Sequence, residues 1–144
     1  MPAPFLPPSP PSSLAQWLGL SAANELDLHK LVTKRLPTSL VASLRAHGLT
    51  EKETSAFVIP RRTLAHRVAA QEPLTVEESD RLLRVARVLA LAETVFGSRE
   101  KAWRWLRKEK HELDERKPID ILDTDIGARL IEEMLYRIDD GIFA

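Results

Sequence analysis

Cysteine is absent from the 144-residue chain, so it can hold no disulfide framework, no thiolate zinc site and no cysteine nucleophile. Long apolar runs are missing too, because the longest covers only residues 88–92, far short of a membrane span. The N-terminus also lacks the basic and apolar regions of a secretory signal. Together these absences lead us to expect a protein of the cytoplasm.

A net charge of one sign is also lacking, since 21 Lys and Arg residues balance 21 Asp and Glu residues. The balance hides an uneven distribution along the chain. Residues 34–70 hold seven basic residues against two acidic ones, whereas residues 118–144 hold two basic residues against seven acidic ones. A basic middle segment suits an anionic partner, and an acidic tail suits a different one. Two solvated faces of opposite sign would give the same distribution.

Apolar residues recur at helical spacing along the chain, and no strand pattern competes with them. Six prolines within residues 1–11 predict an extended leader, and short helices follow it. Two capping boxes, residues 50–53 and 75–78, predict where two helices begin, and Gly97 predicts where the second of them ends. A last helix, from about Asp125 to Asp139, repeats an apolar residue every four positions: Ile126, Leu130, Met134 and Ile138. The sequence therefore predicts an all-α fold.

Residues 50–70 have the layout of a helix-turn-helix. A capped helix leads through a tight connection at Pro60 into a second helix, whose inward positions are Leu64 and Val68. The outward positions of this second helix can face a DNA major groove, where arginine pairs bidentately with guanine. They are Arg61, Arg62, Thr63, His66 and Arg67. An exposed basic helix in an ordinary helical bundle is the alternative interpretation.

No catalytic or metal-binding constellation is visible in the sequence. The four histidines form no pair at the spacing of metal ligands. There is no nucleophile elbow and no glycine-rich phosphate loop. We therefore expect neither an enzyme nor a bound metal or cofactor.

Several motifs, in one order, resemble the Xre/MbcA/ParS family of antitoxins. Residues 59–64, 74–82 and 86–88 resemble the Xre-type helix-turn-helix of that family. Further stretches resemble the C-terminal toxin-binding domain of that family: residues 95–97, Ala102 with Trp105 and Leu106, residues 118–124, Gly127 with Ala128, and residues 137–138 and 141–143. The resemblance covers roughly residues 37–144.

This resemblance implies a type II antitoxin, which binds a co-encoded toxin and represses its own operon. The toxin is typically a RES-domain enzyme that depletes NAD+. We expect three parts: a Pro-rich leader with an N-terminal helical extension over residues 1–36, an Xre-like helix-turn-helix domain over residues 37–96, and a small helical toxin-binding domain over residues 97–144. In the family, the last residues cover the entrance of the toxin's active site, which assigns the toxin contact to Arg137, Gly141, Ile142, Phe143 and Ala144. An apolar end after an acidic helix suits a protein partner.

The N-terminal part departs from the family. Members often carry glycine before the Leu-Pro pair that opens the DNA-binding part, whereas this chain has Arg35 before Leu36 and Pro37. The Pro-rich leader matches nothing in the family. We expect the N-terminal extension to support a homodimer, because a two-fold operator needs paired recognition helices.

A stand-alone transcription regulator is the alternative function. Its C-terminal domain would sense a ligand or oligomerise instead of binding a toxin. A neighbouring RES-type reading frame would favour the antitoxin, and an unrelated metabolic operon would favour the regulator.

Overall fold

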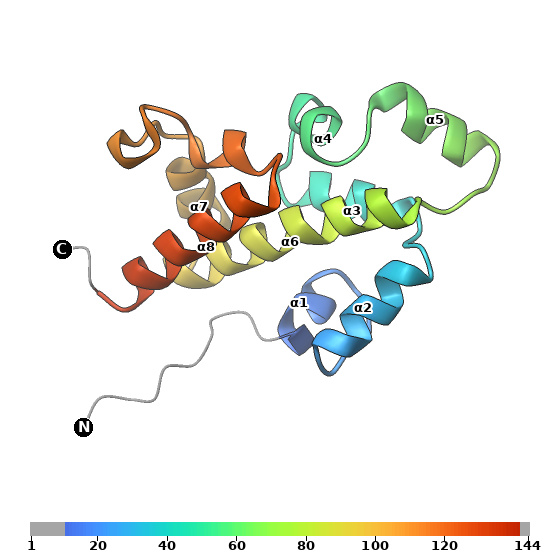
Figure 1. The fold of residues 1–144 in the computed structure, drawn as a ribbon, viewed down its shortest axis with the longest axis horizontal. Helices are drawn as coiled ribbons and strands as arrows, with labels where there is room; N and C mark the ends of the chain where they lie inside the picture. The colour runs from blue at the N-terminus through green and yellow to red at the C-terminus, as the bar shows by residue number, and fades with distance from the viewer. Residues whose placement is uncertain (1–10, 142–144) are drawn as a thin grey trace.

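The structure is a computed structural model that describes residues 11–141. Within this range the chain forms eight α-helices and two 3-10 helices, and the only strand-like pairing is a single bridge between Lys110 and Arg116. The predicted all-α fold is thus confirmed. In chain order the elements are α1 (Pro11–Trp17), α2 (Glu25–Thr33), α3 (Ser39–Ala46), α4 (Glu51–Phe57), α5 (Arg61–Ala69), α6 (Val76–Phe96), α7 (Arg99–Leu106), η1 (His111–Leu113), η2 (Pro118–Ile121) and α8 (Asp125–Asp139) (Figure 1).

The long helix α6 forms the spine of the fold. It packs against α1 and α2, against α4, and against α7 and α8 (Figure 1). A helix that is covered on several sides must be apolar around most of its circumference, and α6 buries a near-continuous apolar stretch: Leu82, Leu83, Val85, Ala86, Val88, Leu89, Ala90, Leu91 and Ala92. One continuous core therefore joins the N-terminal helices to α8. Within residues 11–141, no helix has the length and hydrophobicity that crossing a membrane requires.

Both predicted capping boxes are formed. The side chain of Thr50 accepts the N–H of Glu53, whose carboxylate accepts the N–H of Thr50, and Thr75 and Glu78 repeat the arrangement at the start of α6. Gly97 ends α6 in the left-handed conformation, at φ +75°, as predicted. These local signals need only neighbouring residues, which is why the sequence predicts them well.

The predicted apolar face of α8 is wrong at its N-terminal end. Ile126 is 81% exposed and Leu130 is 39% exposed. The residues of α8 that face the core are instead Gly127, Ala128, Ile131, Met134 and Leu135. Each residue of an α-helix turns by about 100°, so a fourfold repeat drifts by about 40° at every step. Positions 126 and 138 therefore cannot lie on one face.

The N-terminal helices belong to the core. Leu14 and Leu18, at α1, and Leu28 of α2 are buried in the same cluster as the aliphatic residues of α6. Arg87 of α6 adds two hydrogen bonds to the carboxylate of Glu25 on α2, at 2.9 and 3.0 Å. The leader before residue 11 lies outside the described residues.

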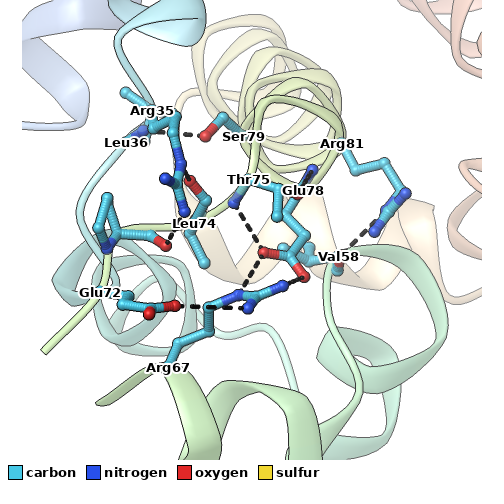
Figure 2. Close-up of polar contacts among 11 residues, drawn as sticks. Arg35, Leu36, Val58, Arg67, Glu72, Leu74, Thr75, Glu78, Ser79 and Arg81 are labelled. Atoms are coloured by element: carbon cyan, nitrogen blue, oxygen red, sulfur yellow. Dashed lines mark hydrogen bonds and ion pairs between the residues drawn. The ribbon is translucent and has the colours of Figure 1, made fainter. Parts of the chain in front are cut away.

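Arg35 occupies the position where the resemblance leads us to expect glycine. Its φ of +68° lies in the left-handed region, which glycine adopts without cost. The Arg35 side chain donates to the carbonyl oxygens of Leu74 at 2.8 Å and Pro73 at 3.1 Å. The next residue, Leu36, donates its N–H to the hydroxyl of Ser79 at 2.9 Å (Figure 2). This chain thus combines a strained backbone with side-chain bonds that fasten the loop before α6.

Candidate functional site

Helices α4 and α5 form the predicted helix-turn-helix, but they differ in how far their residues are buried. Helix α4 buries Thr54 and Phe57, and the turn after it buries Val58 and Ile59. None of the nine residues of α5, all of them described by the structure, is buried. In Figure 1, α5 projects at one end of the molecule. It is therefore available to a partner along most of its circumference.

The expectation that Val68 points inward is wrong. Its side chain is 56% exposed, whereas Leu64 is half-buried and packs against the core. Helix α5 packs against α4, and its C-terminal end projects beyond the start of α6 (Figure 1). The apolar packing of α5 on the body of the protein therefore comes from its first half.

All five residues predicted to bind DNA lie on the first two turns of α5. Arg61 is 82% exposed and its guanidinium lies 3.0 Å from the carboxylate of Glu51. Arg62 and His66 are exposed and Thr63 is half-buried. An ion pair between two exposed side chains is weak, so Arg61 can exchange Glu51 for a phosphate or a base.

The fifth residue, Arg67, does not face outward. Its side chain is only 20% exposed, and its guanidinium makes two hydrogen bonds, of 3.1 and 3.3 Å, to the carboxylate of Glu78 (Figure 2). Glu72 lies 3.8 Å away on the other side. Because Arg67 lies three positions after Leu64, it shares the inward side of α5. The predicted outward direction of Arg67 is therefore wrong.

The Arg67–Glu78 pair alters the electrostatics of both groups. Burial raises the pKa of the Glu78 carboxyl, but hydrogen bonds from Arg67 and Thr75 outweigh burial and leave the pKa below its usual range. The hydrogen bond to Glu78 raises the pKa of Arg67. Both groups are thus held in their charged forms.

At the C-terminal end, Arg137 is exposed on α8 and Gly141 follows the helix with φ +72°. Ile142, Phe143 and Ala144, which the resemblance assigns to toxin contact, lie outside the described residues. The end of α8 and helix α5 lie at opposite ends of the molecule's long axis (Figure 1). The two predicted binding surfaces are therefore well separated.

The exposed face of α8 carries an apolar patch that the sequence did not predict. Ile126 and Leu130 lie one turn apart, and Arg137 lies two turns beyond Leu130, so the three share a face. A separate hollow of about 320 Å³ lies between α6 and α8. It is lined by Leu83 and Ala128 and by the charged residues Asp80, Arg84, Arg87, Asp125, Arg129 and Glu132. The exposed apolar side chains of Ile126 and Leu130 suit a protein contact.

Comparison with known proteins identifies both regions. Residues 27–87 match the antitoxin Xre-like helix-turn-helix domain, and residues 91–141 match the antitoxin Xre/MbcA/ParS C-terminal toxin-binding domain. The first match ends within α6 and the second begins within it. Helix α6 therefore contributes to both.

Individual relatives agree with these matches. An Antitoxin Xre of Pseudomonas putida is 38% identical over 119 residues, which cover 83% of this chain and 75% of the relative. An Antitoxin Xre of Photorhabdus laumondii is 26% identical over 143 residues, which cover 96% of this chain and 97% of the relative. A Prs ADP-ribosylating antitoxin of a Sphingobium species is 31% identical over 98 residues, or 62% of each chain.

The similarity to the Pseudomonas protein extends over most of both chains, and the two family matches follow one another in the order that the motifs predict. These similarities support a toxin partner for the C-terminal region and DNA binding for the helix-turn-helix. The chain belongs to the Xre/MbcA/ParS family of antitoxins.

Proposed function

We propose that this antitoxin neutralises a co-encoded RES-domain toxin that depletes NAD+, and that it represses its own operon by binding DNA through α5. The match of residues 91–141 to a toxin-binding domain carries the proposal for the toxin. The match of residues 27–87 to an Xre-like helix-turn-helix supports the proposal for DNA.

The toxin is held by the exposed face of α8 and by the residues that follow it. Ile126 and Leu130 supply apolar contact area, and Arg137 with Gly141 lead into the tail of Ile142, Phe143 and Ala144. Inhibition is by occlusion: the tail covers the entrance of the toxin's active site, and this chain contributes no chemistry.

Operator DNA is bound by the exposed side of α5. Arg61 and Arg62 read base edges, and Thr63 and His66 contact bases or phosphates. A two-fold operator requires two such helices, so the DNA-binding form is a homodimer. The basic segment 34–70 supplies the electrostatic attraction, and the acidic segment 118–144 faces the toxin instead.

Co-expression with the neighbouring gene tests the proposal. The product of that gene alone should arrest growth and lower the cellular NAD+ level, and this chain should restore both. A tagged form of this chain should also co-purify the toxin. A chain ending at Gly141 is the matched control and should fail to rescue. If the neighbouring product stays lethal in the presence of the full chain and does not co-purify, the proposal is wrong.

A further inference from the structure

The orientation of α5 must be fixed by its contacts with the rest of the protein. A recognition helix must be held within a fraction of an ångström to place its side chains on base edges. Core packing cannot do this here, because every residue of α5 is described and none is buried. Half-buried Leu64 is its main apolar contact. Polar contacts must therefore supply the rest of the orientation.

The Arg67–Glu78 pair is the strongest of these contacts. Both nitrogens of the guanidinium edge meet both oxygens of the carboxylate, which fixes direction as well as distance. Glu78 itself is nearly buried, with 7% of its side chain exposed. Its carboxylate also accepts the N–H of Thr75 at 2.8 Å. The first turn of α6 therefore fixes the position of the Glu78 carboxylate, and this carboxylate fixes the position of Arg67 on α5.

The segments on either side of α5 are fastened to the same region. Arg81 of α6 donates to the carbonyl oxygen of Val58, in the turn before α5, at 3.0 Å. After α5, Arg35 holds the carbonyl oxygens of Pro73 and Leu74. Figure 2 shows the three arginines arranged around the start of α6. Of these contacts, only the Arg67 pair acts on α5 itself.

We propose that Arg67 and Glu78 are positioning residues for DNA recognition: their pair aims α5 at the groove, and Arg67 does not itself contact DNA. This inference rests on the proposed role of α5 in DNA binding. Removing a negative charge near DNA should strengthen binding, yet loss of the Glu78 carboxylate should weaken it.

Three variants at these two positions test the inference. Glu78→Gln keeps the shape of the side chain and can still complete the capping box with its one oxygen. It removes the charge and replaces the other oxygen by an amide NH2 group, which cannot accept a hydrogen bond from Arg67. Arg67→Gln removes the other partner. Arg67→Lys keeps the positive charge but cannot form the two-point contact. Affinity would be measured by fluorescence anisotropy, on a duplex covering the region upstream of the chain's own gene at fixed salt.

Each of the three variants should bind this duplex at least about tenfold more weakly, the size of one lost base contact. The double variant Arg67→Gln/Glu78→Gln should bind no more weakly than either single variant, because both act through one pair. Glu53→Gln removes the matching carboxylate of the other capping box, which pairs with Arg107 of α7. It should leave DNA affinity unchanged. Circular dichroism would confirm that every variant is folded at the temperature of the assay.

The inference is overturned if Glu78→Gln binds as well as the wild type or better while Arg67→Gln binds more weakly. It is likewise overturned if Arg67→Lys binds like the wild type, since the two-point contact with Glu78 would then not be needed to orient α5. In both cases the DNA role of α5 stands, provided that Arg61→Ala and Arg62→Ala still weaken binding. A wild-type chain that does not bind the duplex would overturn the proposed DNA role and this inference with it.

Discussion

Trp103 donates its indole N–H to the backbone carbonyl of His47 at 2.7 Å. This bond connects α7, in the toxin-binding region, to the end of α3, in the DNA-binding region. Arg107, one turn beyond Trp103, lies 3.9 Å from the centre of the indole ring and donates to the carbonyl oxygen of Gly48 at 2.8 Å. The same arginine pairs with Glu53 at the start of α4. The two regions are thus joined by a compact polar contact as well as by α6.

The first prediction follows from the space around Gly48. A β-carbon there would lie 2.2 Å from the indole nitrogen of Trp103, and the φ of +114° is unfavourable for any other residue. Gly48→Ala should therefore lower the free energy of unfolding by about 3 kcal/mol or more, from backbone strain plus overpacking. Gly97→Ala is the control, because Gly97 has φ +75° and no atom of residues 11–141 lies within 4 Å of the added carbon. Gly97→Ala should lower the free energy of unfolding by only about 1 to 2 kcal/mol. Urea unfolding that gave equal losses would contradict the contact with Trp103.

The second prediction concerns Arg35, whose backbone is left-handed. Arg35→Ala keeps the unfavourable φ and loses the bonds to Pro73 and Leu74. Arg35→Gly loses the same bonds but relieves the backbone. Glycine should therefore be the more stable substitution, by about 1 kcal/mol, the reverse of its usual rank below alanine. Chemical denaturation of the two variants decides the order, and an alanine variant at least as stable as the glycine variant would refute this role of Arg35.

The third prediction is a dependence of stability on pH. Burial raises the pKa of Glu53 and Glu78, but the bonds from Arg107 and Arg67 and from the caps outweigh it, so both pKa values lie below the ordinary 4.5. A carboxyl whose pKa is lower in the folded state stabilises the fold above its unfolded pKa, and this stabilisation is lost as the pH falls through the folded value. Melting temperatures should thus fall steeply below about pH 4.5. The double variant Glu53→Gln/Glu78→Gln should melt lower at pH 7 and show a flatter profile, and an equally steep profile would rule out these two groups as the cause.

The fourth prediction tests the apolar patch on α8. Ile126→Glu/Leu130→Glu places charges in the proposed contact and should abolish co-purification of the toxin, while leaving the fold and DNA binding intact. Leu26→Glu is the matched control, because Leu26 is also a strongly exposed leucine but lies on α2. It should leave toxin binding unchanged. Full toxin binding by the double variant would show that this face is not part of the toxin interface. A change in the mass of the isolated chain, measured by light scattering, would instead assign this face to a contact between copies of the chain.

The features that could be predicted from the sequence are those that depend on near neighbours. The Thr50 and Thr75 caps, the end of α6 at Gly97, and the bounds of α8 all follow from residues a few positions apart. The direction in which a side chain points was harder to predict. Arg67 turns inward because its partner Glu78 lies on the next helix, and Ile126 turns outward because α6 covers the other side of α8. Such choices depend on where helices pack, which periodicity alone does not fix.

The central claim is that one chain binds DNA and toxin through surfaces at its two ends. The most direct measurement is a paired assay of operator affinity and toxin inhibition on two variants. Arg61→Ala/Arg62→Ala should lose about 1 to 3 kcal/mol of DNA-binding free energy for each base contact removed and should still neutralise the toxin. A chain lacking Ile142, Phe143 and Ala144 should bind DNA like the wild type and fail to neutralise the toxin. If either variant lost both activities while remaining folded, or if neither lost its assigned one, the division of the two functions between α5 and the α8 tail would be contradicted.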